Sequence, residues 1–153
     1  MRAALEAVAD SFEVLPCDPA LADTAAFCAH YGVDPSESAN TIVVASKKEP
    51  KRYAACLVLA TTRLDVNHAV RALLDNAKLS FASGEETSAL TGMTMGGVTV
   101  FGLPPDLPVF IDSAVLSART VVVGGGSRSM KIRLAPEALS RIPNARVIEG
   151  LAR

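Results

Sequence analysis

The segment Thr41–Thr61, TIVVASKKEPKRYAACLVLAT, contains two apolar runs separated by a short charged stretch. Thr41–Ser46 and Tyr53–Thr61 are rich in β-branched and other apolar residues, which is typical of buried strands. The intervening KKEPKR stretch is polar and carries a proline, so it predicts a turn. We therefore expect the two runs to pair as a β-hairpin in the middle of the fold.

Upstream of this hairpin, apolar spacing and capping residues predict helices around one strand. The expected elements are a helix over Met1–Ala9, a strand over Ser11–Leu15 and a helix from Asp18 to Gly32. Aspartate followed by proline is a typical helix start, and glycine is a typical helix end. A second such start at Asp34 places Glu37 for a capping box and leads the chain to Asn40.

Downstream of the hairpin, the same signals predict further strands with helices between some of them. In chain order we expect a helix capped by Asp65, a strand over Leu79–Ala82, a helix from Ser83 to Gly92, strands over Val109–Ser113, Thr120–Val123 and Met130–Leu134, a helix from Pro136 and a strand over Arg146–Ile148. Ser83 and Glu86 have the spacing of a capping box. Gly124–Gly126 is expected to be a tight connection.

The balance of these elements indicates the fold class. Strands outnumber helices, and many are joined as hairpins instead of alternating strictly with helices. We therefore expect an α/β (α+β) fold, with a mixed, curved central β-sheet and helices packed around it, and not a Rossmann fold. The 153 residues are a typical length for one domain, so we expect a single domain over residues 1–153.

Composition excludes several classes of protein. The net charge is −1 at pH 7, so no general positive field attracts nucleic acid. Cys17, Cys28 and Cys56 are scattered, which predicts buried apolar side chains and not a metal site. We find no nucleotide-phosphate motif and expect no metal or cofactor. No apolar run approaches the roughly 20 residues of a membrane span, so we expect a cytoplasmic protein without a membrane partner.

A glycine-rich stretch, Gly92–Gly102 (GMTMGGVTVFG), is the main candidate for a functional site. Gly96 and Gly97 allow the backbone to approach a ligand closely, and their adjacent N–H groups can point at a developing oxyanion. The alternative is a glycine-rich bulge or turn between strands. Spacing alone leaves both interpretations open.

The order of several segments resembles one known family. Six segments follow one another in the order found in the YbaK-type editing domain: LDVNHAVRALL, KLSFAS, EETSALTG, GGVTVFG, VFIDSAV and GGGSRSMKIRLAPEAL. That family includes a free-standing Cys-tRNA(Pro) deacylase and the editing insertion of prolyl-tRNA synthetase. The resemblance implies hydrolysis of a mischarged aminoacyl-tRNA without a metal or covalent intermediate. It also implies backbone contacts from a loop in which Gly96, Gly97 and Gly102 match, with Val100 where proline is usual.

Other positions of the family's pocket differ in this sequence. Asn40 stands where the family has its key catalytic lysine, Cys17 replaces a tyrosine, and Lys131 replaces an aspartate. The candidate substrate-binding residues are Cys17, Thr41, Gly102, Asp112 and Lys131. The resemblance also places an aspartate at position 112, where it can support the glycine loop. Lys131 can place an ammonium group in the pocket from the opposite strand and so compensate for Asn40. The alternative is a surface lysine on an alternating strand.

Basic residues and the pocket together define two functional hypotheses. The residues that could contact tRNA phosphates are Lys47, Lys48, Lys51, Arg52 and Arg128. For the first four, the alternative is a solvated turn. The first hypothesis is a trans-acting deacylase that binds the acceptor end of an aminoacyl-tRNA, with tRNA(Pro) favoured. The second is a diverged homologue that binds aminoacyl-tRNA, an amino acid or a protein partner without hydrolysis.

Overall fold

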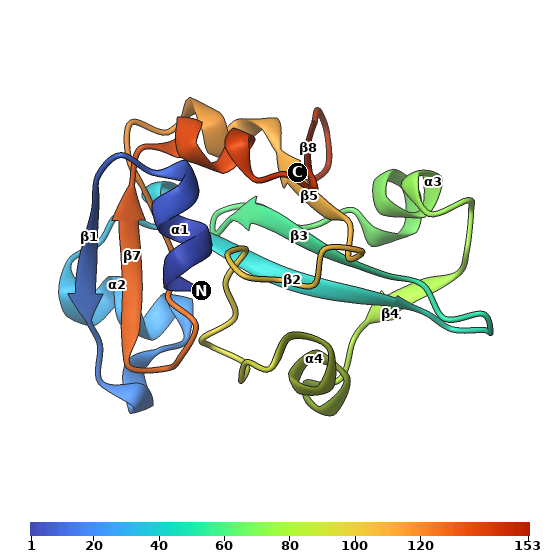
Figure 1. Ribbon diagram of the computed structural model, residues 1–153, viewed down its shortest axis with the longest axis horizontal. Helices are drawn as coiled ribbons and strands as arrows, with labels where there is room; N and C mark the ends of the chain where they lie inside the picture. Colours follow the sequence, from blue (N-terminus) through green and yellow to red (C-terminus); the bar gives the residue numbers. More distant parts are fainter.

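The computed structural model describes all 153 residues, from Met1 to Arg153 (Figure 1). Its eight strands form one sheet of five strands and one of three. In spatial order, the larger sheet contains β4 (Leu79–Phe81), β2 (Ala39–Ser46), β3 (Tyr53–Leu59), β5 (Val109–Asp112) and β8 (Ala145–Ile148). The smaller sheet contains β1 (Phe12–Pro16), β7 (Met130–Leu134) and β6 (Val121–Gly124).

The expected hairpin of β2 and β3 is confirmed and lies in the middle of the larger sheet (Figure 1). The two strands pair antiparallel, from Ala39 opposite Leu59 to Ala45 opposite Tyr53. β4 pairs antiparallel with the other edge of β2, whereas β5 and β8 continue the sheet in parallel with β3. The sheet is therefore mixed, as the fold class predicts. Because β2 begins at Ala39, Asn40 lies inside the strand.

The smaller sheet is antiparallel and combines the N-terminal strand with two strands from the last third of the chain. It meets the larger sheet at an isolated parallel bridge between Ser38 and Val122. The sequence predicts each of these strands but assigns them to one sheet. Their division into two sheets depends on the pairing of β1 with β7, two strands more than 100 residues apart, which local patterns do not specify.

Helices and short helical turns connect and cover the sheets. They are α1 (Arg2–Val8), η1 (Pro19–Leu21), α2 (Thr24–Tyr31), η2 (Pro35–Glu37), η3 (Val66–Val70), α3 (Arg71–Leu73), α4 (Gly84–Thr91), η4 (Ser113–Ser117) and η5 (Pro136–Arg141). The expected capping box of Ser83 and Glu86 begins α4, and Gly92 ends it in the left-handed conformation. The longest helices have eight residues, far fewer than a bilayer crossing requires.

Two of the expected helix starts differ in the structure. Asp18 caps only the 3-10 turn η1, and the α-helix begins further on, at Thr24. Glu37 does not form the expected capping box with Asp34. Its carboxylate instead accepts a hydrogen bond from the hydroxyl of Thr120, at 3.0 Å, so a contact distant in sequence replaces the local one.

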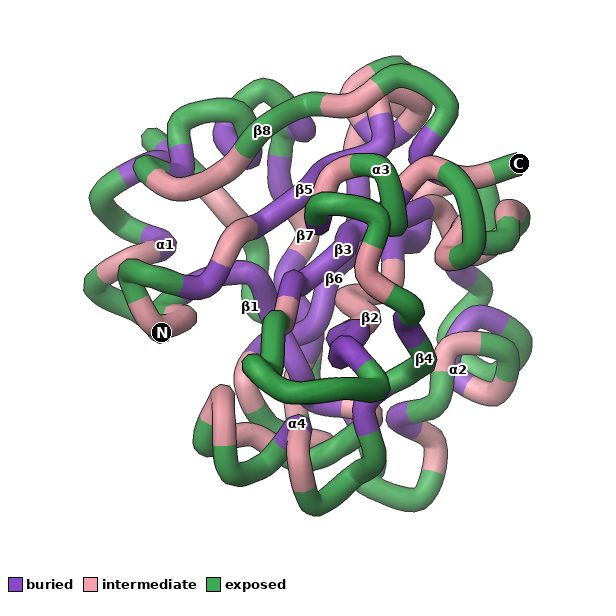
Figure 2. Tube along the Cα trace, turned by 90° about the vertical axis from the view of Figure 1, so that its right-hand side faces the viewer, coloured by how far each residue is buried: buried purple, intermediate pink, exposed green.

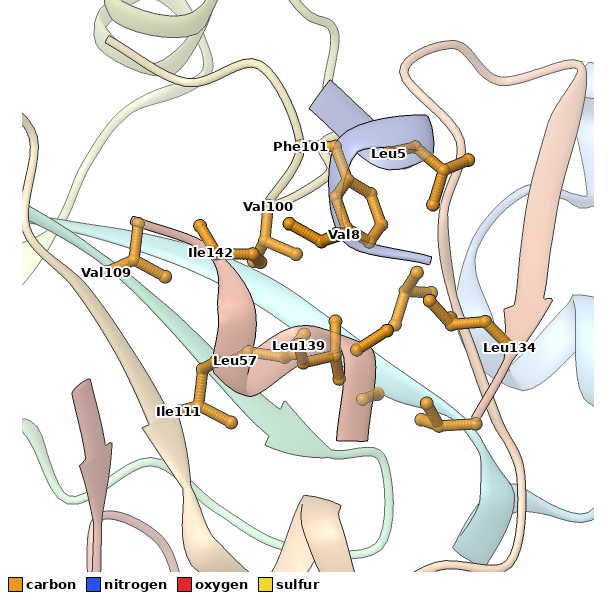
Figure 3. Close-up of a cluster of buried hydrophobic side chains, with 14 of the residues drawn as sticks. Leu5, Val8, Leu57, Val100, Phe101, Val109, Ile111, Leu134, Leu139 and Ile142 are labelled. Atoms are coloured by element: carbon orange, nitrogen blue, oxygen red, sulfur yellow. The ribbon is translucent and has the colours of Figure 1, made fainter. Parts of the chain in front are cut away.

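The main hydrophobic core lies between the two sheets and is covered by α1 and η5 (Figure 3). Its members include Leu5, Leu57, Ile111, Ile132, Leu134, Leu139 and Ile142. A second cluster fills the opposite face of the larger sheet, beneath η3 and α3. Figure 2 shows the central strands buried, with exposed turns around them. All three cysteines are buried and unpaired, as predicted, and burial raises the pKa of Cys56 to about 12.

Candidate functional site

A cavity of about 330 Å³ lies where β2 of the larger sheet faces β6 of the smaller one. The start of α2 and the glycine-rich segment complete its wall. Its lining residues are Ala22, Asp23, Thr24, Phe27, Ser38, Ala39, Asn40, Thr41, Ile42, Val43, Phe81, Ala82, Thr87, Met95, Gly96, Val98, Val122, Val123, Gly124 and Lys131. The structure thus brings together four of the residues that the sequence singles out, namely Asn40, Thr41, Gly96 and Lys131.

Lys131 is a buried lysine, which excludes the surface interpretation. Its side chain extends from β7, and only 7% of the residue is exposed. The ammonium group donates to the carbonyl oxygens of Ala22 at 2.7 Å and Gly96 at 2.9 Å, and lies 5.6 Å from the centre of the Phe27 ring. Loss of solvation lowers its pKa from the ordinary 10.5. The ammonium group forms no ion pair. Two of its three N–H groups donate to the two carbonyls, so one remains available as a donor.

The two central glycines have different roles. Gly97 donates its N–H to the carbonyl of Thr94 at 2.9 Å, so its amide is not free for an oxyanion, contrary to expectation. A Cβ atom at Gly97 would lie 2.4 Å from the carbonyl carbon of Ser127, so this position requires glycine for close backbone packing. Gly96 adopts φ +89° and packs beneath Arg128. Its own N–H donates to no atom of the chain.

Asn40 and Thr41 lie next to one another on β2, and both line the cavity. The Asn40 side-chain oxygen accepts a hydrogen bond from the hydroxyl of Thr24, the first residue of α2. The hydroxyl of Thr41 is buried without a hydrogen-bond partner, and no other buried side-chain polar atom lacks one. A buried hydroxyl without a partner costs free energy, so it marks a position where a ligand can bind.

Besides Gly97, three expected site residues of the pocket lie outside the cavity lining. Cys17 is buried beside Phe27, and its thiol donates to the Asp18 carbonyl at 3.3 Å. Gly102 packs closely against the backbone of Met1, so that a Cβ atom added at position 102 would lie 3.0 Å from the terminal nitrogen. Asp112 is 3% exposed, and its carboxylate accepts backbone hydrogen bonds near the C-terminus and not from the glycine loop. The donors to Asp112 are Leu151, Ala152 and Ser113, and burial raises its pKa.

The basic residues do not form one surface around the cavity. The turn that contains Lys47, Lys48, Lys51 and Arg52 projects from the end of the molecule opposite α2 (Figure 1). Arg52 pairs there with Asp75, and Lys51 donates to the Ser46 carbonyl at 2.9 Å. Arg128, in contrast, lies beside the cavity. It donates to the Pro19 carbonyl at 2.9 Å and the Met95 carbonyl at 2.8 Å, and pairs with Asp23 at 3.2 Å.

The sequence pattern does not indicate several lining residues. Asp23 and Thr24 follow an apparent helix start and acquire their positions only because α2 begins late. Phe81 and Met95 are large apolar residues beside polar or glycine neighbours, which is the one signal available for them. Asp23 and Lys131 are the cavity's only charged residues. No group of three or more potential metal ligands is present anywhere in the structure.

Comparison with known proteins agrees with this geometry. The sequence matches the family described as the aminoacyl-tRNA editing domain over residues 18–142. A candidate Cys-tRNA(Pro)/Cys-tRNA(Cys) deacylase of Enterococcus faecalis, EbsC, is 31% identical over 85 residues, which are 50% of this chain and 52% of that protein. The uncharacterized protein YwhH of Bacillus subtilis is 36% identical over 70 residues, 46% of this chain and 45% of that protein. The chain thus spans about half the length of these curated relatives.

Two crystal structures share the fold over nearly the whole chain. The hypothetical protein APE2540 superposes with a TM-score of 0.81 at 25% identity, over 94% of this chain and 92% of that one. A candidate trans-editing enzyme for prolyl-tRNA synthetase superposes with a TM-score of 0.79 at 26% identity, over 97% and 92%. Because the family match covers most of the sequence, including Asn40, Gly96 and Lys131, the chain belongs to the aminoacyl-tRNA editing domain family.

Proposed function

We propose that the protein is a free-standing deacylase that hydrolyses the ester bond of a mischarged aminoacyl-tRNA, with tRNA(Pro) as the favoured carrier. The observation that carries this proposal is the cavity between the sheets, whose wall contains the buried ammonium of Lys131. Family membership and the names of EbsC and the structural relative support the same reaction class. The cavity's volume is at the lower end of the roughly 300–1,000 Å³ of ligand pockets, which favours a small acyl group.

The proposed chemistry uses donors that the fold leaves available. Water adds to the ester carbonyl carbon, and the negative charge that develops on its oxygen is stabilised by the remaining N–H of Lys131 and the amide of Gly96. The bond from the carbonyl carbon to the ribose oxygen then breaks. The amino acid leaves as a carboxylate, one proton of the attacking water passes to the ribose oxygen, and the other is released to solvent.

In this proposal the substrate itself, and not a side chain of the protein, assists the attacking water. The only carboxylate in the wall belongs to Asp23, which is exposed and paired with Arg128 at 3.2 Å. A carboxylate that is open to solvent and engaged by a guanidinium group is a poor candidate for a general base. The neighbouring hydroxyl of the terminal ribose can instead orient the water by accepting a hydrogen bond from it, and can relay a proton from the water to the leaving ribose oxygen. Asn40 contributes a neutral amide where the family's lysine is expected, so Lys131 carries the positive charge.

The second candidate function is binding without hydrolysis. The observation that favours it is the hydrogen bond between Asn40 and Thr24, which uses the Asn40 oxygen within the chain. In that case the cavity retains the acyl group and no rate enhancement follows. An incubation experiment separates the two functions. The wild type, Lys131→Met, Asn40→Lys and Arg133→Met are each incubated with Ala-tRNA(Pro), Cys-tRNA(Pro) and correctly charged control tRNAs.

For a deacylase, we expect the wild type to release the amino acid from at least one mischarged tRNA. Lys131→Met should lower kcat/KM about a hundredfold or more, as loss of an oxyanion donor typically does. Arg133→Met is the matched control, because Arg133 lies on the same strand but faces solvent and pairs with Glu13. Turnover by Asn40→Lys alone, with none by the wild type, would establish the binding function and contradict the deacylase.

A further inference from the structure

Two exposed apolar side chains lie at the cavity. Large hydrophobic residues in this protein are mostly covered, yet Phe81 is 60% exposed and Met95 is 51% exposed. Both are among the cavity's lining residues, one from β4 and one from the glycine-rich segment. β4 is an edge strand that pairs only with β2, so the Phe81 ring is open to solvent on one side. Exposed apolar surface beside a cavity indicates a binding surface.

A basic recess adjoins the same phenylalanine. Phe81 also lines a shallow depression whose wall includes Arg63, His68 and Arg153. Arg153 and His68 share the carboxylate of Asp65, whereas Arg63 is exposed and makes no ion pair. The recess therefore carries an excess of positive charge next to the aromatic ring. An aromatic ring beside a basic groove is the combination that binds single-stranded nucleic acid.

We infer that Phe81 is the stacking platform for the terminal nucleobase of the acceptor strand, and that Arg63 receives the phosphate preceding it. The inference rests on the proposed function, because the acyl group in the cavity is attached to the ribose of that same nucleotide. Once the acyl group is inside, the base must lie at the rim. Phe81 lines both the cavity and the recess, so this residue joins the acyl site to the backbone site.

Stacking of the base on Phe81 explains how the protein binds tRNA with a net charge of −1. Affinity then comes from one base face and one phosphate contact rather than from a broad basic surface. Base stacking tolerates any nucleobase, since every base presents a π-face. The Lys47–Arg52 turn is not needed for this contact.

The test uses an oligoribonucleotide that ends in CCA, carries alanine on its 3′ end through an amide, and has 2-aminopurine as its last base. Because the amide is not hydrolysed, binding is measured whether or not the protein is an enzyme. We expect the fluorescence of 2-aminopurine to be quenched on the wild type. Phe81→Ala should abolish the quenching and raise Kd about tenfold to a hundredfold, whereas Phe81→Trp should retain both.

A double-mutant cycle excludes a merely structural effect. An otherwise identical probe without the terminal base should bind wild type and Phe81→Ala equally, because the contact is already absent. Val147→Ala, which shortens another exposed apolar side chain away from the cavity, should leave binding unchanged. Arg63→Gln should weaken binding and reduce its salt dependence.

The failures of the two proposals are distinguishable. Hydrolysis by wild type with an unchanged KM and unchanged quenching in Phe81→Ala would overturn the stacking inference and leave the deacylase intact. Quenching that depends on Phe81, without hydrolysis of any charged tRNA, would support the nucleobase site and overturn the deacylase. An equal loss of affinity for the probes with and without the base would also overturn the stacking inference.

Discussion

The hydroxyl of Thr41 is the one buried side-chain polar atom without a partner, and it belongs to a residue of the cavity wall. A binding site that leaves a donor unpaired until substrate arrives is less stable than it could be. We therefore predict that Thr41→Val unfolds with a free energy equal to the wild type's or up to about 1 kcal/mol higher. Its KM for the mischarged tRNA should nevertheless rise about tenfold.

Urea denaturation and steady-state kinetics on the same preparations measure the two effects. Thr62→Val is the matched control, because the Thr62 hydroxyl donates to the Leu59 carbonyl at 2.7 Å. That variant should lose about 1 kcal/mol of stability without a change in KM. A destabilised Thr41→Val with normal kinetics would mean that the hydroxyl serves the fold.

Lys131 gives the protein a defined dependence of stability on pH. Burial lowers the pKa of the folded ammonium below the unfolded value of 10.5. Between these two values the unfolded chain binds more protons, so the free energy of unfolding rises with pH across that window. At pH values below the folded pKa, Lys131 is charged in both states, and the full cost of burying its charge lowers the free energy of unfolding.

We predict that wild type gains stability relative to Lys131→Met as the pH is raised toward 10.5, while deacylation, corrected for hydroxide-catalysed background, declines. Denaturation curves from neutral to alkaline pH measure the first effect. Cys17, Cys28, Asp23 and Arg128 also interact with the ammonium, so the comparison is repeated with both cysteines replaced by alanine. A pH-independent difference between wild type and Lys131→Met would contradict the prediction.

At the scale of elements, the glycine-rich segment is a packed turn as well as part of the cavity wall. Gly97 lies against the Ser127 backbone, so an added methyl group forces the two segments apart. We predict that Gly97→Ala loses about 1–3 kcal/mol of stability, the usual cost of overpacking. Gly84→Ala is the control, since its Cβ would meet only Met95 at 3.9 Å within a helix, and it should gain about 0.5–1 kcal/mol.

If Gly97→Ala and the wild type are equally stable in thermal and urea unfolding, the Ser127 backbone moves aside at little cost in free energy. That result would contradict the prediction. The outcome tests the turn interpretation of this segment and leaves its role at the cavity to the kinetic experiments. The structure combines them: the turn exists because of Gly97, and its neighbour Gly96 offers the carbonyl that Lys131 binds and the free amide.

Local patterns predicted the elements whose determinants are local. The β2–β3 hairpin, the capping box of Ser83 and Glu86, and the helix ends at Gly32 and Gly92 all depend on residues a few positions apart. The predictions were wrong where a residue distant in the sequence replaces the expected local partner. Glu37 binds Thr120 in place of its capping partner.

The candidate site shows the same division. Asn40 and Lys131 were identified from the resemblance, Gly96 from the glycine-rich stretch, and Thr41 as the neighbour of Asn40. All four line the cavity. Gly102 and Asp112 were placed there by the same resemblance, but their contacts lie elsewhere. Phe81 was missed because its significance depends on exposure at a sheet edge, which a single sequence does not report.

At the scale of the molecule, the cavity belongs to neither sheet alone. β2 supplies one wall and β6 with β7 the other, so an occupant contacts both sheets. We predict that the non-hydrolysable alanyl probe slows amide hydrogen exchange in β2 and β6 together and leaves β8 unchanged. At a probe concentration 100 times Kd, openings that disrupt the cavity cost about 2.7 kcal/mol more, whereas openings confined to β8 are unaffected. Protection confined to one sheet would place the binding site elsewhere.

The bridge between Ser38 and Val122 joins the two sheets beside the cavity, while most of the core between them is apolar. The width of the cavity therefore depends on how core side chains set the separation of the sheets, and not only on the residues that touch the substrate. For the proposed deacylase, buried substitutions remote from the reacting atoms can therefore change the preference for a larger or smaller acyl group. An alignment of pocket residues alone would then group together proteins that prefer acyl groups of different sizes.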